Sequence, residues 1–148
     1  MTERGQTMAY VGEFVHQLDS RSRVTVPSSW RVAGDDGSYY LAWPHPEGCV
    51  VVYQPHMQEA LLAKAADARL SDIQSQKMLR RLFGRASKFG CDKQGRILIP
   101  DSLKQHAGIA KQVSLVGLGH YFQIWDAARR EAEDDDFNLL EAMAEMGI

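Results

Sequence analysis

The feature that most restricts the fold of this chain is an internal repeat. The segment Phe14-Val-His-Gln-Leu-Asp-Ser-Arg-Ser-Arg-Val-Thr-Val-Pro27 aligns without a gap with Ser87-Lys-Phe-Gly-Cys-Asp-Lys-Gln-Gly-Arg-Ile-Leu-Ile-Pro100, at an offset of 73 residues. The identical positions form three pairs, Asp19/Asp92, Arg23/Arg96 and Pro27/Pro100. A duplication of this extent predicts two copies of one supersecondary unit that bury a common core.

Each copy predicts the same order of elements. A strand, a turn, a β-branched strand and a proline-initiated short helix are followed by two strands and a terminal helix. The expected ranges are strands 14–18 and 87–91, turns 19–22 and 92–95, strands 23–27 and 96–99, helices 28–33 and 101–107, and strand pairs 38–43 with 49–53 and 112–116 with 121–125. The terminal helices are expected at 55–70, at 72–83 with Ser71 as N-cap, and at 127–146.

The fold class is therefore expected to be α+β and rich in β-structure. We place a first unit at residues 10–76, a second at 77–128 and an acidic helical tail at 129–148.

The net charge of −2 hides an uneven distribution of charge along the chain. Residues 126–148 hold eight acidic and two basic residues, whereas residues 77–96 hold seven basic residues and one acid. The basic centre keeps nucleic acid open as a partner despite the negative total.

Several other function classes find little support in the sequence. No apolar run approaches the roughly 20 residues of a membrane helix, and residues 1–8 lack the apolar core of a signal peptide, so we expect a cytoplasmic protein without a membrane partner. Cys49 and Cys91 form no CxxC pair and are expected to be reduced core residues. No histidine spacing indicates a metal site, and no catalytic constellation is visible. We expect no enzyme activity, cofactor or small-molecule substrate.

The repeated motif is Asp-x-x-x-Arg at a turn, Asp19 to Arg23 and Asp92 to Arg96. An aspartate that opens a turn accepts hydrogen bonds from backbone amides two residues on. It is also expected to pair with the arginine four residues later and so to direct the guanidinium, which suits phosphates and guanine edges. A two-stranded ribbon carrying that arginine is narrow enough for the DNA major groove. The plainer alternative is a solvated hairpin with a surface ion pair of little energetic weight.

Further cations accompany the two turns. Arg21 lies in the first turn and Lys93 in the second, so we expect both to contact DNA along with the two arginines of the motif. Arg85 and Lys88, which precede the second turn, are possible additional DNA contacts. The alternative for these last two is a linker between the copies.

At this point the residues resemble a known family. Gly12-Glu-x-x-His16-x-Leu-Asp19, followed by Arg23 and Pro27, is similar to the start of the MraZ proteins. Cys91 to Pro100, Val113-Ser-Leu-Val-Gly-x-Gly119 and Phe122-Gln-Ile-Trp125 resemble the later part of that family. The resemblance covers about residues 9–130, and its motifs occur in order and at the spacing of the family.

The resemblance implies tandem SpoVT/AbrB-like swapped-hairpin domains, described as β-barrel units with peripheral helices. It implies a sequence-specific transcription regulator that associates with the nucleoid. Such a protein binds double-stranded DNA at short direct repeats upstream of the division and cell-wall gene cluster, which includes its own gene. It also implies a homo-oligomer in the form of a closed ring, in which weak contacts add up.

This chain departs from the family pattern at two positions of the first turn. Ser22 stands where the family has glycine, and because serine tolerates a positive φ less well, we expect the first turn to differ in shape from the second. Arg21 replaces a lysine and keeps the charge. A second function also stays open: an antitoxin-like or protein-interaction module that binds a basic partner through the acidic tail.

Overall fold

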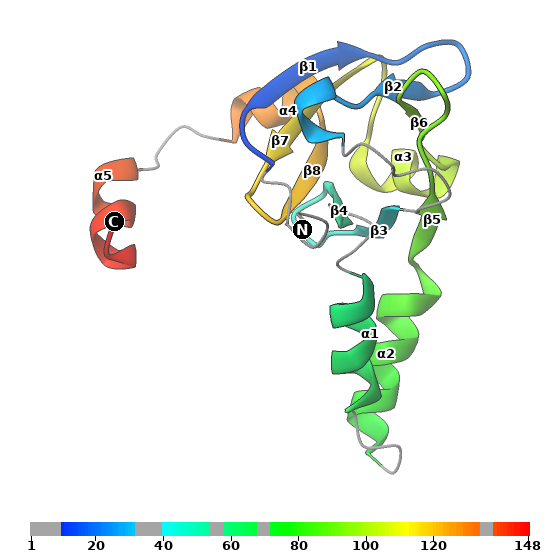
Figure 1. The fold of residues 1–148 in the computed structure, drawn as a ribbon, viewed down its shortest axis with the longest axis vertical. Helices are drawn as coiled ribbons and strands as arrows, with labels where there is room; N and C mark the ends of the chain where they lie inside the picture. Colours follow the sequence, from blue (N-terminus) through cyan, green and yellow to red (C-terminus); the bar gives the residue numbers. More distant parts are fainter. Residues whose placement is uncertain (1–9, 32–39, 54–57, 68–71, 134–137) are drawn as a thin grey trace, which may run out of the picture.

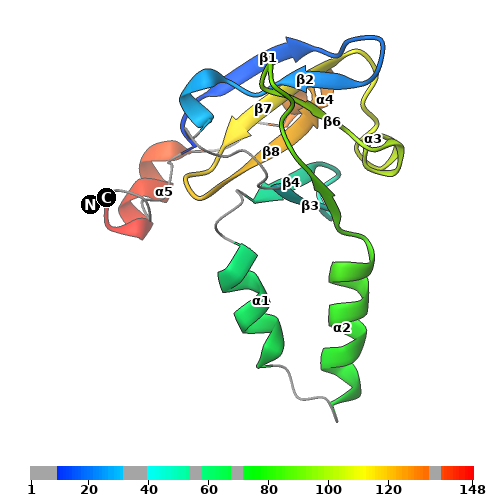
Figure 2. The ribbon, with the colours of Figure 1, turned by 45° about the vertical axis from the view of Figure 1, so that its right-hand side comes forward.

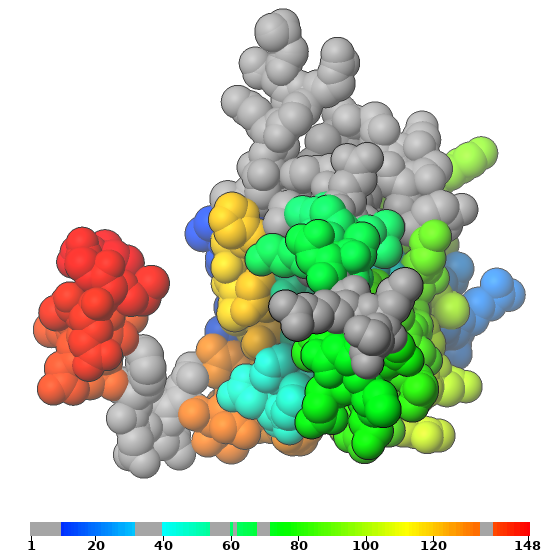
Figure 3. All heavy atoms as spheres, turned by 90° about the horizontal axis from the view of Figure 1, so that it is seen from below, coloured from blue at the N-terminus to red at the C-terminus, as the bar shows by residue number. Residues whose placement is uncertain are grey.

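A computed structural model of the chain describes residues 10–31, 40–53, 58–67, 72–133 and 138–148. Its body is β-structure, from which the helices α1 (Gln58–Ala66) and α2 (Ile73–Gly84) project together to one side (Figure 1). The turned ribbon shows the same projection of α1 and α2 (Figure 2). A further helix, α5 (Leu139–Met146), lies away from the body in the first view and in the view from below (Figures 1 and 3). No helix in the described ranges is long and apolar enough to cross a membrane.

The main sheet has six antiparallel strands in the order β1-β7-β8-β4-β3-β5. Its strands are β1 (Glu13–Gln17), β3 (Tyr40–Pro44), β4 (Val50–Tyr53), β5 (Ser87–Phe89), β7 (Gln112–Gly117) and β8 (Tyr121–Asp126). The first strand of each copy pairs with the third strand of the other, β1 with β7 and β5 with β3, and β4 pairs with β8 at the centre. The order therefore reads the same from either edge when the two copies are exchanged.

A second, two-stranded sheet joins β2 (Arg23–Thr25) of one copy to β6 (Arg96–Leu98) of the other. One face of this β2–β6 ribbon is buried, because Val24 and Ile97 are at most 1% exposed and belong to the core. The other face is open. Each ribbon strand leads through a proline into a short helical element, the 3-10 helix η1 (Ser28–Trp30) or the helix α3 (Asp101–Ala107).

The core is centred on Trp30, which is 1% exposed and surrounded by aromatic rings. Its ring centroid lies 5.3 Å from that of Tyr10, 5.4 Å from Phe14 and 5.1 Å from Phe122. Trp30 Nε1 also donates a hydrogen bond to the Val11 carbonyl at 3.1 Å. Aromatic contacts of this kind, together with the area buried, make the cluster a major source of stability.

The expected α+β, β-rich class is confirmed, and most strands lie close to their expected ranges. No closed barrel is present among the described residues. The copies share one main sheet, and the units expected at 10–76, 77–128 and 129–148 stay a prediction. The helix expected at 28–33 is wrong at Arg31, whose backbone is extended (φ −99°, ψ 135°) and ends a 3-10 turn. Residues 32–39, including the rest of that helix, lie outside the described residues.

The C-terminal helix expected at 127–146 is also wrong, because two helices occupy that range. The first, α4 (Ala127–Ala132), ends with Glu133 as its C-cap. The second is α5, where the Asn138 side chain accepts a hydrogen bond from the Glu141 amide and begins a new helix. Helix α1 is described from Gln58, and residues 55–57 of the helix expected there lie outside the described residues. Asp72 caps α2. Ser71, the expected cap, lies outside the described residues.

Arg129 of α4 ties the C-terminal part of the chain to the body. Its guanidinium donates to the Gly48 carbonyl at 2.7 Å, the Ala107 carbonyl at 3.1 Å and the Glu47 carbonyl at 3.3 Å. It also lies over the Trp125 ring, 5.9 Å from the centroid. Helix α4 is therefore an integral part of the fold, whereas α5 exposes Leu139, Leu140 and Met146 by 62–79%.

The two cysteines are free thiols in different environments. Cys49 is fully buried beside Val51 and Trp125, and burial, reinforced by the charge of Glu47, raises the pKa of its thiol to about 12. Cys91 is partly buried and packs against the main core, as its match to Leu18 in the repeat predicts. A disulfide between them is not formed.

Alkylation should distinguish the two thiols. In the native protein at pH 8 we expect iodoacetamide to modify Cys91 slowly and to leave Cys49 unmodified, because the thiolate is the nucleophile and Cys49 is both protonated and inaccessible. Mass spectrometry of tryptic peptides measures both sites, and the same reaction in denaturant is the control that should modify each. Native Cys49 reacting as fast as Cys91 would contradict this placement.

Candidate nucleic-acid interface

Turn one, residues 19–22, is held by the carboxylate of Asp19. Its Oδ1 accepts hydrogen bonds from the amides of Arg21 at 2.8 Å and Arg23 at 2.9 Å. Its Oδ2 accepts from Arg23 Nε at 2.7 Å. The backbone closes the same turn, since the Asp19 amide donates to the Arg23 carbonyl and the Ser22 amide donates to the Asp19 carbonyl, both at 3.0 Å. One aspartate therefore fixes both the turn and the direction of its arginine.

Turn two, residues 92–95, has the same set of bonds. Asp92 Oδ1 accepts from the amides of Gln94 and Arg96 at 2.9 Å, and its Oδ2 accepts from Arg96 Nε at 2.9 Å. The Asp92 amide donates to the Arg96 carbonyl at 2.9 Å. The ion pair that the Asp-x-x-x-Arg spacing predicts is present in both copies.

Serine in turn one does not change the hydrogen-bond pattern of the turn. Ser22 has φ of 62° and Gly95, its equivalent, has φ of 79°. Both are left-handed, a conformation that glycine adopts freely and that serine adopts at some cost. Ser22 is the one non-glycine residue with positive φ among the described residues, so turn one keeps the shape of turn two at the expense of local strain.

Both aspartates stay ionised at neutral pH. Hydrogen bonds from the backbone of Arg23 and Arg96, ahead of the side-chain bonds and charges of the same arginines, lower the pKa of Asp19 and of Asp92 below their ordinary value. Each carboxylate is therefore available to hold its turn and its guanidinium throughout the neutral range.

The expected two-stranded ribbon exists, but it does not join the two strands that flank one turn. The strands that flank each turn do not pair with one another: β1 pairs with β7, and β2 pairs with β6. The β2–β6 ribbon thus takes one strand from each copy. Its register places Arg23 opposite Leu98 and Arg96 opposite Thr25.

This register brings the two arginines of the motif to one surface. Val24 and Ile97 occupy the buried face of the ribbon, so the alternate residues occupy the opposite face, which carries Arg23, Thr25, Arg96 and Leu98. Arg96 Nη1 lies 3.9 Å from Asp19 Oδ2, a link between the two turns. The side chains of Arg23 and Arg96 keep 25% and 29% of their area accessible. The surface therefore presents two directed guanidinium groups on a rigid backing.

Arg21 and Lys93 lie within the two turns and are exposed. Neither side chain forms an ion pair with any residue in the described part of the chain. They add two cations at the margins of the ribbon face, one from each copy. This arrangement suits a polyanion better than it suits a single small ligand.

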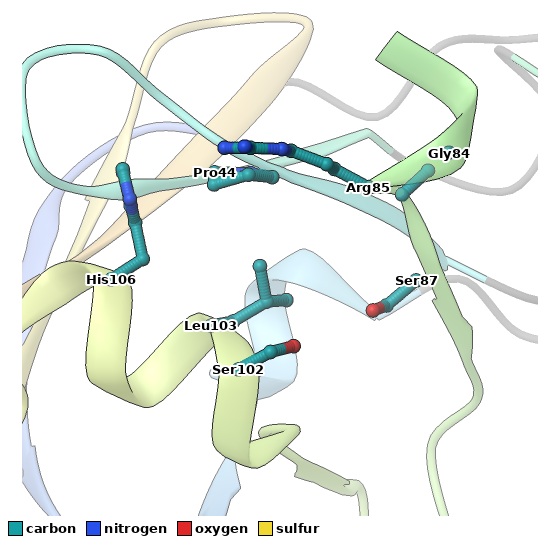
Figure 4. Close-up of a pocket in the computed structure, with 8 residues that line it drawn as sticks. Pro44, Gly84, Arg85, Ser87, Ser102, Leu103 and His106 are labelled. Carbon is teal, nitrogen blue, oxygen red and sulfur yellow. The ribbon is translucent and has the colours of Figure 1, made fainter. Parts of the chain in front are cut away.

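Arg85 and Lys88 lie outside the β2–β6 ribbon and its two turns. Arg85 is the C-cap of α2 and lines a cavity of about 340 Å³ with Pro44, Ser102 and His106 (Figure 4). Lys88 is exposed on β5, opposite Leu41. Their role in binding stays a prediction. The described residues hold no cluster of metal-ligating side chains.

The structure adds two cations that the motif did not single out, Arg31 and Lys104. They are equivalent positions of the repeat, and each lies against the turn of the opposite copy. The sequence could have indicated these two residues, because both copies have a basic residue at this position of the repeat. The contact itself is not visible there, because it joins residues from different copies.

Comparison with known proteins gives a consistent result. Residues 82–144 match the family model described as "MraZ protein, putative antitoxin-like". The chain is 31% identical over 144 residues to the transcriptional regulator MraZ of Acetivibrio thermocellus, which covers 94% of this chain and 99% of that protein. It is 35% identical to the transcriptional regulator MraZ of Bordetella pertussis over 84% of this chain and 89% of that protein. The protein of the same name from Finegoldia magna is 32% identical over 88% and 90%.

Proposed function

Because this chain belongs to the MraZ family, we propose that it is a transcription regulator that binds double-stranded DNA in a sequence-specific manner. The observation that carries the proposal is the β2–β6 ribbon, on which two arginines, one from each copy, are each held by their own aspartate. A guanidinium held in one direction loses little freedom on binding, and its fork suits guanine O6 and N7.

The division of roles follows from position. Arg23 and Arg96, on the open face of the ribbon, read base edges, whereas Arg21 and Lys93, in the turns, bind phosphates and set the register. Asp19 and Asp92 organise the turns and do not contact DNA. The buried face of the ribbon, with Val24 and Ile97 in the core, keeps the two arginines at a constant spacing.

The finer proposals follow from the family. We infer that the targets are short direct repeats upstream of the division and cell-wall genes, including the gene of this protein, and that the protein is associated with the nucleoid in the cytoplasm. A closed ring of identical chains would let several ribbons meet adjacent repeats together. The exchange of β1 and β5 between the copies supports two SpoVT/AbrB-like swapped-hairpin units.

A titration of the wild-type protein tests this function. Fluorescence anisotropy with a duplex of direct repeats is compared with a shuffled duplex at about 50 and 200 mM salt. We expect tighter binding to the repeats and a steep loss of affinity with salt, because each phosphate neutralised contributes about 0.9 to the slope of log K against log salt. Equal binding of the two duplexes, or no dependence on salt, would be incompatible with the proposal.

The second candidate is a protein-interaction module, favoured by α5 and the residues that follow it, where Leu139, Leu140, Met146 and Ile148 are 62–79% exposed. Deleting residues 134–148 removes this helix and spares Arg129, which anchors α4 to the body. If DNA binding is the function, the truncated chain keeps the affinity of the full chain within about twofold. A loss of function in the cell with DNA affinity intact would favour the interaction module.

A further inference from the structure

Each turn of the interface is covered by a cation from the opposite copy. Lys104 of α3, in the second copy, donates from Nζ to the Ser22 hydroxyl of turn one at 2.6 Å. Arg31, which follows η1 in the first copy, lies over Gly95 of turn two: a Cβ added to Gly95 would be 2.5 Å from Arg31 Cζ. Gly95 is buried under this guanidinium although it lies in a turn.

The two contacts are equivalent in the repeat. Arg31 and Lys104 are 73 residues apart, as are Ser22 and Gly95. Two backbone bonds explain why the contacts cross between copies: the Val26 amide donates to the Gly95 carbonyl at 2.9 Å, and the Ile99 amide donates to the Ser22 carbonyl at 3.0 Å. These bonds bring the end of each ribbon strand, and the helical element after it, beside the turn of the other copy.

The chemistry of each turn residue matches the cation that covers it. At turn two the broad guanidinium of Arg31 occupies the space that a Cβ would need, so a side chain at residue 95 would displace Arg31 and would also be strained by the left-handed φ. At turn one the smaller ammonium of Lys104 leaves room for a side chain and uses its hydroxyl as an acceptor. The bond to Lys104 therefore offsets part of the cost of a left-handed serine.

We propose that Lys104 and Arg31 are positioning residues of the interface, each of which holds the left-handed residue that immediately precedes the arginine of the opposite turn. Lys104 acts on Arg23 through Ser22, and Arg31 acts on Arg96 through Gly95. The two turns are thereby coupled, so that neither copy presents its arginine correctly without the other. The effect of this coupling on DNA affinity rests on the proposed DNA-binding function. The coupling between the two turns does not depend on that function.

An exchange of the matched pair tests the inference at constant charge. Lys104→Arg alone should weaken DNA binding about fivefold, within the coupling that residues in contact show, because the larger guanidinium meets the Ser22 side chain. Ser22→Gly alone should weaken binding less. The double variant recreates the arginine–glycine combination of turn two, and we expect it to recover wild-type affinity. If the loss of DNA affinity in the double variant equalled the sum of the free-energy losses of the two single variants, the inference would be overturned.

Lys104→Met distinguishes positioning from direct phosphate contact. If Lys104 positions Ser22, Lys104→Met should weaken DNA binding in the wild-type background and leave it unchanged in the Ser22→Gly background. The slope of log K against log salt should stay the same in both. Equal losses in both backgrounds, with the slope reduced by about 1, would mean that Lys104 binds phosphate and would overturn the proposal.

A measurement without DNA separates this inference from the proposed function. Hydrogen exchange of the Arg21 and Arg23 amides, which donate to Asp19, reports on turn one directly. We expect Lys104→Met to speed their exchange while the core amides of β7 and β8 stay protected. If the wild-type chain bound no DNA, the function would fail and this result would still decide the coupling. Unchanged exchange at Arg21 and Arg23 would overturn it.

Discussion

The double variant Arg23→Ala with Arg96→Ala is expected to lose sequence-specific DNA binding, with an affinity for direct-repeat DNA reduced at least about 30-fold. An arginine that reads a guanine edge contributes about 1–3 kcal/mol, and 1.4 kcal/mol is a factor of ten. Each single variant should lose about fivefold or more on the same basis. Anisotropy titration at constant salt measures all three proteins.

The fold should survive this change. Both side chains lie on the open face of the ribbon, and Asp19 and Asp92 keep their bonds from backbone amides, including those of residues 23 and 96. The matched control is Lys77→Ala with Arg80→Ala, which removes the same charge from exposed positions of α2, the helix that projects from the body (Figure 1). We expect that control to bind within a few-fold of wild type. Unchanged affinity in the ribbon variant would exclude the assigned interface.

Replacement of Trp30 by alanine should have the largest effect on stability. Large-to-small changes at buried Phe or Trp cost about 3–5 kcal/mol, a large part of the roughly 5–15 kcal/mol that stabilises a typical domain. The substitution removes the contacts of the Trp30 ring with three aromatic rings, and it leaves the Val11 carbonyl without its hydrogen-bond donor. We expect a much lower urea midpoint, and in addition weaker DNA binding, because Trp30 also supports the buried face of the ribbon.

A matched control separates burial from a general loss of apolar area. Leu98→Ala removes an apolar side chain from the open face of the same ribbon, where it is 50% exposed, and should cost about 0.5 kcal/mol or less. Equal urea midpoints for the two variants would contradict the central place of Trp30 in the core. Trp30→Leu, which installs the residue found at the equivalent position Leu103, should be milder than Trp30→Ala.

Interactions between near neighbours were predictable from the sequence. The bonds of Asp19 to Arg21 and Arg23 span two and four residues, and the repeat doubles the evidence for them. The left-handed Gly108 that ends α3 follows the same local rule. The apolar strands 49–53 and 121–125 also lie close to their expected places, because their runs of β-branched and aromatic residues favour strands.

Errors occurred where local propensity competed with distant contacts. The pattern over 127–146 favours one helix, yet α4 is held at its end by Arg129 and a new N-cap at Asn138 begins α5. At Arg31 the helix expected from proline gives way to extended backbone. In that position the side chain covers Gly95, a residue 64 positions away in the chain.

By itself, the sequence determined that one segment recurs at an offset of 73 residues. It also determined that each turn holds its own arginine, because that bond joins residues only four positions apart. Only the tertiary structure decided that β2 pairs with β6, that Arg23 and Arg96 therefore share a face, and that Lys104 and Arg31 cross to the opposite turns. Strand partners are chosen by which apolar faces pack into the common core. That choice depends on the whole chain, so no local pattern carries it.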